Sequence, residues 1–173
     1  SVFISLFFSS SLIAQTLNFN DAVTLIDENG HAEIPVDYTA VGANAFRNLA
    51  ALKTLTVPSS IISIGNGAFA GTANLLQINL TSGLESIGDS AFEQSGLLGI
   101  DIPPTVTSVG PYAFAFGNLT HLTIPQSINT IGEFAFFDNP LTHLEFSMAN
   151  QDGISSGAFS LACNTCFHIE MIA

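Results

Sequence analysis

Positively charged residues are almost absent from this sequence. Among 173 residues only Arg47 and Lys53 are basic, against fourteen Asp and Glu, and the formal net charge is −12. A protein that binds nucleic acid needs a basic surface to neutralise phosphates, and two cations cannot build one. Anionic lipid is disfavoured as a partner for the same reason. The composition therefore excludes nucleic acid as a ligand.

The sequence also lacks a hydrophobic run of the roughly 18–20 residues that a membrane-spanning helix requires. Hydrophobic residues nevertheless make up 47% of the chain, and charged residues only 9%. Such a composition is typical of a chain that buries a core and argues against disorder. We predict a core-forming protein without a transmembrane segment.

Motifs that carry catalysis or hold a cofactor are absent as well. The chain contains no G-x-S-x-G, P-loop, dinucleotide fingerprint or complete EF-hand loop. Its serines and carboxylates are scattered, and a repetitive open fold offers no deep pocket from which water is excluded. We predict that the protein is not an enzyme and binds no cofactor.

The first residues form an apolar but short stretch. Residues 1–14 suit the hydrophobic region of a secretory signal peptide, although an initiating Met and a basic start are missing. The alternative is a buried strand or helix at the end of the fold. We favour the signal, which predicts an exported protein. Residues 15–29 do not match the pattern that follows, and we interpret them as an N-terminal cap, a short hairpin over the end of a repeat array.

An Ala-Phe pair recurs along the rest of the chain. The steps between successive pairs are 23, 23, 22, 22 and 23 residues. A constant period of this size indicates a stack of similar units, each of which buries its apolar face against its neighbours. The pairs are Ala45-Phe46, Ala68-Phe69, Ala91-Phe92, Ala113-Phe114, Ala135-Phe136 and Ala158-Phe159.

Each unit contains two further apolar pairs in a fixed order. The first pair alternates with polar residues, which predicts a strand with one face inward. These pairs are Ala32/Ile34, Leu55/Val57, Ile78/Leu80, Ile100/Ile102, Leu122/Ile124, Leu144/Phe146 and Phe167/Ile169. The second pair predicts a short extended segment on the far side of each unit. These pairs are Tyr38/Val41, Ile61/Ile64, Leu84/Ile87, Val106/Val109 and Ile128/Ile131.

A glycine follows the second apolar pair in five units and precedes Ala-Phe, as Gly65 does. A glycine at a fixed point predicts either a positive φ or a close approach of two backbones. We place Ala-Phe on a short helical or 3₁₀ turn and expect the phenylalanines to stack as an interior spine.

Units such as Ile124-Pro125…Ile131-Gly132…Ala135-Phe136 resemble the BspA-like (Treponema-type) leucine-rich repeats of exported bacterial proteins. The resemblance implies a leucine-rich-repeat solenoid over residues 30–173. It further implies a parallel β-sheet on one face and short strands with 3₁₀ or helical turns on the other. Members of that family act at the cell surface or outside the cell in adhesion or protein binding. No catalytic residue is carried over. We also expect the chain to continue beyond Ala173, because the last unit is left without a polar cap.

The outward strand positions are the candidate binding face. They form two columns, in which all four histidines of the sequence fall. The first column is His31, Thr54, Gln77, Gly99, His121, His143 and Cys166. The second column is Glu33, Thr56, Asn79, Asp101, Thr123, Glu145 and His168. Neither column contains an aromatic residue of the Phe, Tyr or Trp type.

Two chemical sites are conceivable at the C-terminal end. His121, His143, Glu145 and His168 supply the residue types that bind Zn²⁺, although an ordinary wet strand surface explains them better. Cys163 and Cys166 either form a local disulfide, as suits an exported protein, or remain two packed thiols.

Two functions follow from this reading. The leading hypothesis is a secreted or cell-surface module that binds a protein or glycan through the strand face. The alternative is a structural spacer that presents another domain beyond residue 173.

Overall fold

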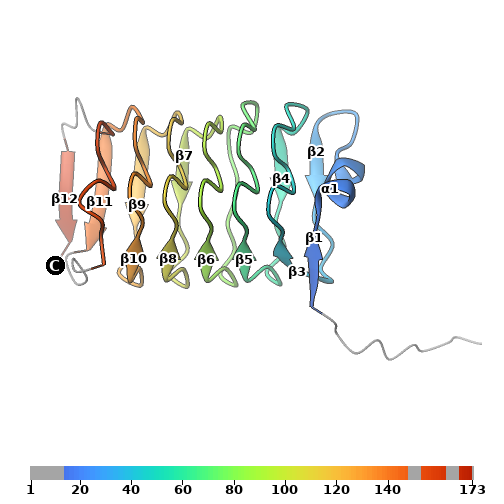
Figure 1. Cartoon of the computed structure of the whole chain (residues 1–173), viewed down its shortest axis with the longest axis horizontal. Coiled ribbons are helices and arrows are strands. Elements are labelled where there is room, and N and C mark those ends of the chain that lie inside the picture. The colour runs from blue at the N-terminus through green and yellow to red at the C-terminus, as the bar shows by residue number, and fades with distance from the viewer. Residues whose placement is uncertain (1–13, 148–152, 163–167, 173) are drawn as a thin grey trace, which may run out of the picture.

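A computed structural model describes residues 14–147, 153–162 and 168–172. The chain winds into a stack of repeats, with the N-terminal segment at one end and β12 at the other (Figure 1). We number the repeats 1 to 6 by their phenylalanines, from Phe46 to Phe159. The predicted signal peptide falls almost wholly outside the described residues, and so do Cys163 and Cys166.

Two sets of parallel strands run along opposite sides of the stack (Figure 1). One side carries a two-stranded and a four-stranded sheet. Their strands are β2 (His31–Glu33), β4 (Thr54–Thr56), β7 (Gly99–Asp101), β9 (His121–Ile124), β11 (His143–Ser147) and β12 (His168–Ile172). The other side carries one six-stranded sheet. Its strands are β1 (Gln15–Leu17), β3 (Tyr38–Val41), β5 (Ser63–Ile64), β6 (Ser86–Ile87), β8 (Ser108–Val109) and β10 (Thr130–Ile131).

The parallel sheet predicted for one face is present, but its strands are not continuous. The pair Ile78/Leu80 was predicted on a strand, whereas residues 75–81 form none. Within the described chain, residues 77–80 make no backbone hydrogen bond to either neighbouring repeat; only the carbonyl of Leu76 accepts one, from Leu98 N at 3.2 Å. The face is therefore divided between β4 and β7.

The phenylalanine spine is confirmed. Consecutive rings of Phe46, Phe69, Phe92, Phe114, Phe136 and Phe159 lie 5.0–5.3 Å apart between centroids, with interplanar angles of 4–10°. The first five are fully buried, together with the alanine that precedes each. Offset stacking of aromatic rings adds to the burial of their area, so the spine joins each repeat to the next.

The Ala-Phe segments are short turns closed by i→i+3 hydrogen bonds, and among the described residues none of them extends into a 3₁₀ or α-helix. In repeat 1, Arg47 N donates to Asn44 O at 3.1 Å, and Leu49 N donates to Phe46 O at 3.2 Å. The residues at the two corners, Asn44 and Asn48, have φ values of 58° and 57°. A left-handed residue on either side of Ala-Phe interrupts any helical run.

The repeated glycine serves a close approach between backbones. A Cβ added to Gly65 would lie 2.7 Å from Ala43 N, and one added to Gly88 would lie 2.8 Å from Asn66 N. Neither glycine has a positive φ. At these two positions glycine is therefore needed for a close approach of two backbones and not for a positive φ, the other reason that the sequence allowed.

The N-terminal segment is a strand and a helix, so the predicted hairpin is wrong. Strand β1 pairs in parallel with β3, and helix α1 (Phe19–Leu25) follows it. Asn18 caps the helix by accepting from the backbone N–H groups of Asn20 and Asp21, and Asp21 completes a capping box. Burial, and then the Asp21 carboxylate, raise the pKa of the Tyr38 phenol on the neighbouring β3.

The register of the last strand also differs from the prediction. We placed Phe167/Ile169 level with Leu144/Phe146, but Leu144 pairs with Ile169 and Phe146 pairs with Met171. The step from His143 to His168 is 25 residues, longer than the other steps, so the column is shifted by two. His168 is therefore level with His143 and not with Glu145.

Candidate functional site on the strand face

We call the outward side of β2, β4, residues 77–79, β7, β9 and β11 the strand face. The structure places the predicted binding residues on it at the described positions. In one column His31 pairs with Thr54 and His121 pairs with His143. In the other column Glu33 pairs with Thr56 and Thr123 pairs with Glu145. Asp101 pairs with Thr123, and Gln77 and Asn79 are exposed beside them.

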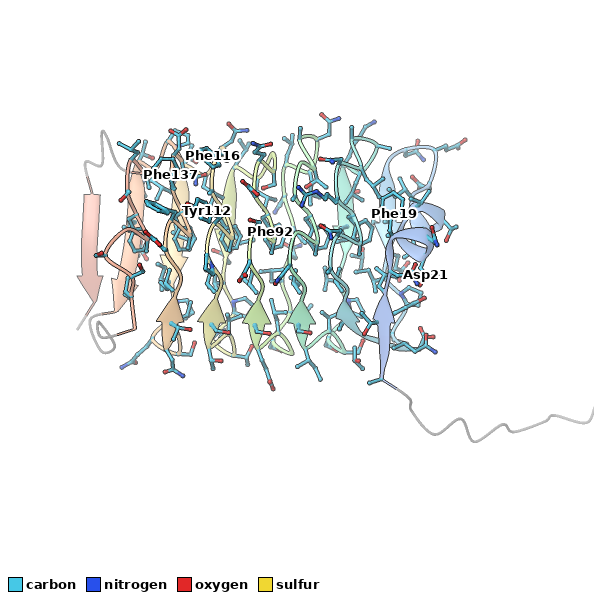
Figure 2. All side chains as sticks on the ribbon, viewed as in Figure 1. Phe19, Asp21, Phe92, Tyr112, Phe116 and Phe137 are labelled. Carbon is cyan, nitrogen blue, oxygen red and sulfur yellow. The ribbon has the colours of Figure 1, made fainter. Side chains whose placement is uncertain are left out.

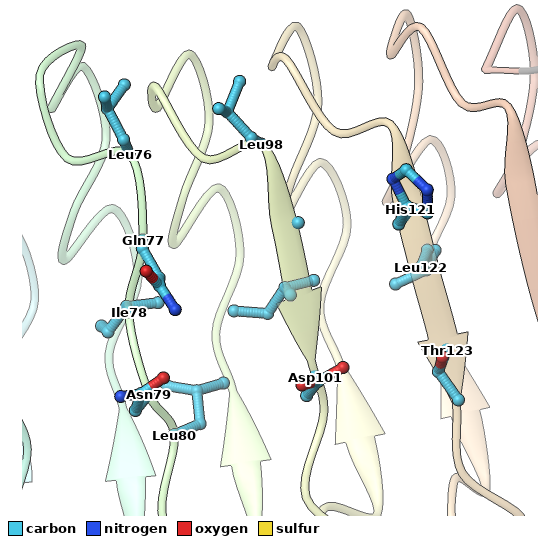
Figure 3. A pocket seen from close by; sticks show the side chains of 12 residues that line it. Leu76, Gln77, Ile78, Asn79, Leu80, Leu98, Asp101, His121, Leu122 and Thr123 are labelled. Carbon is cyan, nitrogen blue, oxygen red and sulfur yellow. The ribbon is translucent and has the colours of Figure 1, made fainter.

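A depression interrupts this face at Gly99. It has a volume of about 500 Å³ and lies over residues 76–80, 98–101 and 121–123. Gly99 contributes no side chain between Gln77 and His121, so the column has a gap there (Figure 3). We call this feature the Gly99 depression.

The lining of the Gly99 depression is polar at its centre and apolar at one edge. Gln77, Asn79, Asp101, His121 and Thr123 project around it (Figure 3). Asp101 is its only carboxylate, and no Lys or Arg lines it. The interrupted backbone of residues 77–80 lies on its floor, with peptide N–H and C=O groups that the neighbouring repeats leave unpaired. Such groups are strong hydrogen-bonding partners for a ligand.

Two leucines border the Gly99 depression on one side. Leu76 is 54% exposed and Leu98 is 51% exposed, while the preceding Leu75 and Leu97 are fully buried. The prediction from the outward columns missed both edge leucines and the gap at Gly99. The Leu-Leu doublets carried the signal, because only one leucine of each pair can face the core.

The histidines of the strand face are oriented by threonines. His31 Nδ1 lies 2.8 Å from Thr54 Oγ1, His121 Nδ1 lies 2.8 Å from Thr120 Oγ1, and His143 Nδ1 lies 3.0 Å from Thr142 Oγ1. The Thr120 hydroxyl donates to Leu98 O at 3.0 Å, and the Thr142 hydroxyl donates to Thr120 O at 3.1 Å. These two hydroxyls can each accept a hydrogen bond from the neighbouring imidazole when its Nδ1 carries the proton.

The proposed metal set is only partly brought together. The rings of His121 and His143 stack with centroids 4.5 Å apart and an interplanar angle of 7°. Two nitrogens on a tetrahedral Zn²⁺ lie roughly 3.3 Å apart and point at one ion, whereas stacked rings aim their nitrogens in parallel. Among the described residues, no three potential metal ligands converge. The side chain of His168 lies outside the described residues, so the complete candidate set of four residues is not tested, and an ordinary wet strand surface stays the favoured interpretation.

The repeat pattern itself identifies the chain. Residues 39–166 match the BspA type leucine-rich repeat region in six copies. The chain belongs to the BspA type leucine-rich repeat family. This confirms the solenoid fold and the resemblance on which it was predicted. In the part of this leucine-rich repeat chain that the structure describes, no helix is long and apolar enough to cross a membrane.

Two solved structures place the chain beside other leucine-rich repeat proteins. One is a leucine-rich repeat protein from Bacteroides ovatus, with 20% identity and a TM-score of 0.67 over 82% of this chain and 45% of that one. The other is a leucine-rich repeat protein of T. pallidum, with 28% identity and a TM-score of 0.64 over 71% and 60%. The chain thus spans about half the length of these relatives. A comparison with curated proteins found no match.

Proposed function

We propose that the protein is an exported, non-catalytic recognition module that binds a protein or glycan at the strand face. The Gly99 depression is the observation that carries this proposal. It combines amides, a carboxylate, an imidazole and unpaired peptide groups with two exposed leucines. Concave sites with a few convergent polar groups beside apolar ones are the usual form of a binding site.

The open shape of the depression fits an extended ligand better than a small molecule. Its lining comes from three successive repeats, at positions of the same two columns. Repeat proteins use such regular surfaces to contact peptide segments or sugar chains along their length. Asp101 is unopposed by any cation in the lining, which favours a ligand that donates hydrogen bonds.

The test compares the wild-type protein with Gly99→Thr on arrays of glycans and extracellular proteins. A Cβ at Gly99 would meet only His121 O, at 3.8 Å, so a side chain fits without a clash and occupies the gap. We expect the wild type to bind a discrete ligand and the variant to lose it by at least tenfold. A Thr56→Ser variant, on the same face outside the depression, is the matched control and should bind within twofold of the wild type.

A spacer role is the second candidate. Among the described residues, the strand face carries no Phe, Tyr or Trp, the residues that dominate many binding interfaces. Blank arrays for the wild type would support the spacer. If the wild type and Gly99→Thr bind the same ligand with equal affinity, the ligand-binding site lies on another surface.

A further inference from the structure

Five apolar side chains gather on the Ala-Phe corner of repeats 4 to 6, away from the strand face. Tyr112 is 37%, Phe116 41% and Leu161 57% exposed, and Phe134 and Phe137 are half-buried. Figure 2 shows Tyr112, Phe116 and Phe137 close together toward the C-terminal end of the stack. We call these five residues the aromatic patch.

Ring contacts make the aromatic patch continuous. The ring centroids of Tyr112 and Phe134 lie 5.3 Å apart, those of Phe134 and Phe137 lie 5.4 Å apart, and those of Phe116 and Phe137 lie 5.2 Å apart. None of these rings belongs to the buried spine, which lies beneath them. The patch is therefore a second aromatic cluster, on the surface.

The backbone at the aromatic patch disfavours bulky side chains. Tyr112, Phe116, Phe134 and Leu161 have φ values of 55–58°, in the left-handed region where Gly and Asn are preferred. The same corners in repeats 1 to 3 are filled by small or polar residues. Those residues are Asn44, Gly67 and Ser90 at the first corner, and Asn48, Gly71 and Gln94 at the second.

The fold does not require aromatic residues at these corners, because three repeats form the same turn without them. Residues held in sparsely populated backbone regions concentrate where they serve binding or catalysis. Contiguous exposed apolar patches likewise mark interaction surfaces, and aromatic side chains are frequent anchors in them. Backbone conformation and exposure thus point independently to a docking surface.

The surroundings of the aromatic patch are acidic. Glu133 and Asp138 are exposed and flank Phe134 and Phe137 in the sequence. A hollow of about 430 Å³ opens beside Phe116 and Leu161, and Asp138 also lines it. The two basic residues of the protein, Arg47 and Lys53, lie in repeat 1 and not in the repeats that carry the aromatic patch. The formal net charge is −12. A second copy of the chain would be repelled here, while a cationic partner would be attracted.

We propose that the aromatic patch docks a cationic amphipathic segment of another protein. Apolar side chains of that segment pack on Tyr112, Phe116 and Leu161, and one enters the hollow. Its Lys or Arg residues meet Asp138 and Glu133. This surface is separate from the strand face, so its occupation is independent of the ligand proposed there.

The test measures binding of a fluorescent, helical Leu/Lys peptide by anisotropy. A scrambled peptide of the same composition, without an apolar face, corrects for unspecific attraction to the acidic protein. The Tyr112→Asn/Phe116→Asn variant introduces the residue that repeat 1 carries at both corners. The matched control is Val23→Asn/Ile62→Asn, which removes two apolar side chains that are 45% and 46% exposed and lie outside both proposed binding surfaces. Thermal melts verify that each variant is folded.

We expect the wild type to bind the amphipathic peptide at least tenfold more tightly than the scrambled one. The Tyr112→Asn/Phe116→Asn variant should lose at least that factor, and the control should stay within twofold. Equal binding of both peptides, or equal losses in both variants, would overturn the proposal. Wild-type self-association that the Tyr112→Asn/Phe116→Asn variant abolishes would overturn it as well, in favour of a second copy as the occupant.

Discussion

Single phenylalanines hold neighbouring repeats together. Phe92 lies in the middle of the spine, with its ring centroid 5.0 Å from those of Phe69 and Phe114. We expect Phe92→Ala to lower the free energy of unfolding by about 3–5 kcal/mol, because the cavity cannot collapse between two stacked rings. Urea denaturation followed by circular dichroism measures this. A loss below about 1 kcal/mol would show that the spine is not a principal source of stability.

Asn139 is a buried polar residue that joins two repeats. Its Nδ2 donates to Phe114 O at 2.8 Å and to Phe136 O at 3.0 Å, and its Oδ1 accepts from Leu119 N at 3.0 Å. A Cβ added to Gly117 would lie 2.8 Å from the same Oδ1, so the amide occupies space that Gly117 leaves.

We expect Asn139→Ala to cost about 2–4 kcal/mol, since several buried peptide groups lose their partner. Asn139→Ser should cost less, because Ser95 is buried at the equivalent position of repeat 3. Chemical denaturation of both variants tests the order. Equal losses of unfolding free energy in the two variants would show that the missing side-chain volume, rather than the missing hydrogen bonds, causes the destabilisation.

At the scale of one strand or turn, the glycines separate into two kinds. Gly99→Thr puts a β-branched side chain on a strand where it meets no close atom, so we expect unchanged or slightly raised stability. Gly88→Ala forces a Cβ against the backbone of the preceding repeat, and we expect a loss of about 1–3 kcal/mol. Melting temperatures of the two variants should therefore move apart. A larger loss for Gly99→Thr would contradict the geometry.

The turn before β2 contains a carboxylate with a lowered pKa. Asp27 Oδ1 accepts from His31 N at 2.9 Å and from Asn29 N at 2.8 Å. The His31 N–H is the main cause that brings the Asp27 pKa below 3.8. The ionised Asp27 carboxylate therefore stabilises the fold above the pKa that Asp27 has in the unfolded chain. This stabilisation is lost as the pH falls through the lower pKa of Asp27 in the folded protein.

Carbon-detected NMR titration should accordingly find the midpoint of Asp27 below its value in a peptide. Asp27→Asn keeps an acceptor but cannot titrate, so its stability should fall less steeply below about pH 4. A midpoint at or above the peptide value would refute the assignment.

Elements that repeat were predictable, and those that occur once were not. The period, the inward pairs and the Phe46–Phe159 spine follow from side-chain type at fixed spacing, so they could be derived without coordinates. The interruption at residues 77–80 depends on hydrogen bonds that no side chain reports. The register of His168 is shifted because the last repeat is longer than the others. Helix α1 begins at an Asn18–Asp21 capping box, in a segment that we predicted as a hairpin. Of the site, the polar columns were predicted, but the edge leucines Leu76 and Leu98 were not.

For the whole molecule, the excess of acid is the dominant electrostatic feature. Fourteen carboxylates and two cations give strong self-repulsion in the folded stack. We expect the melting temperature to rise as sodium chloride increases from about 10 mM to 500 mM, because salt shortens the range of repulsion to a few ångströms. A melting temperature that is constant or falls over this range would show that local ion pairs outweigh the net charge.

Because the strands lie across the stack, their hydrogen bonds run along its length and would carry any tension between the two ends. The six-stranded sheet supplies such bonds from β1 to β10. On the strand face they are missing between β4 and residues 77–80. A pull on the molecule would thus be borne there by the six-stranded sheet, the Ala-Phe turns and the Phe46–Phe69 contact. We expect the first mechanical break between repeats 1 and 2, which would leave repeats 2 to 6 as an intact block.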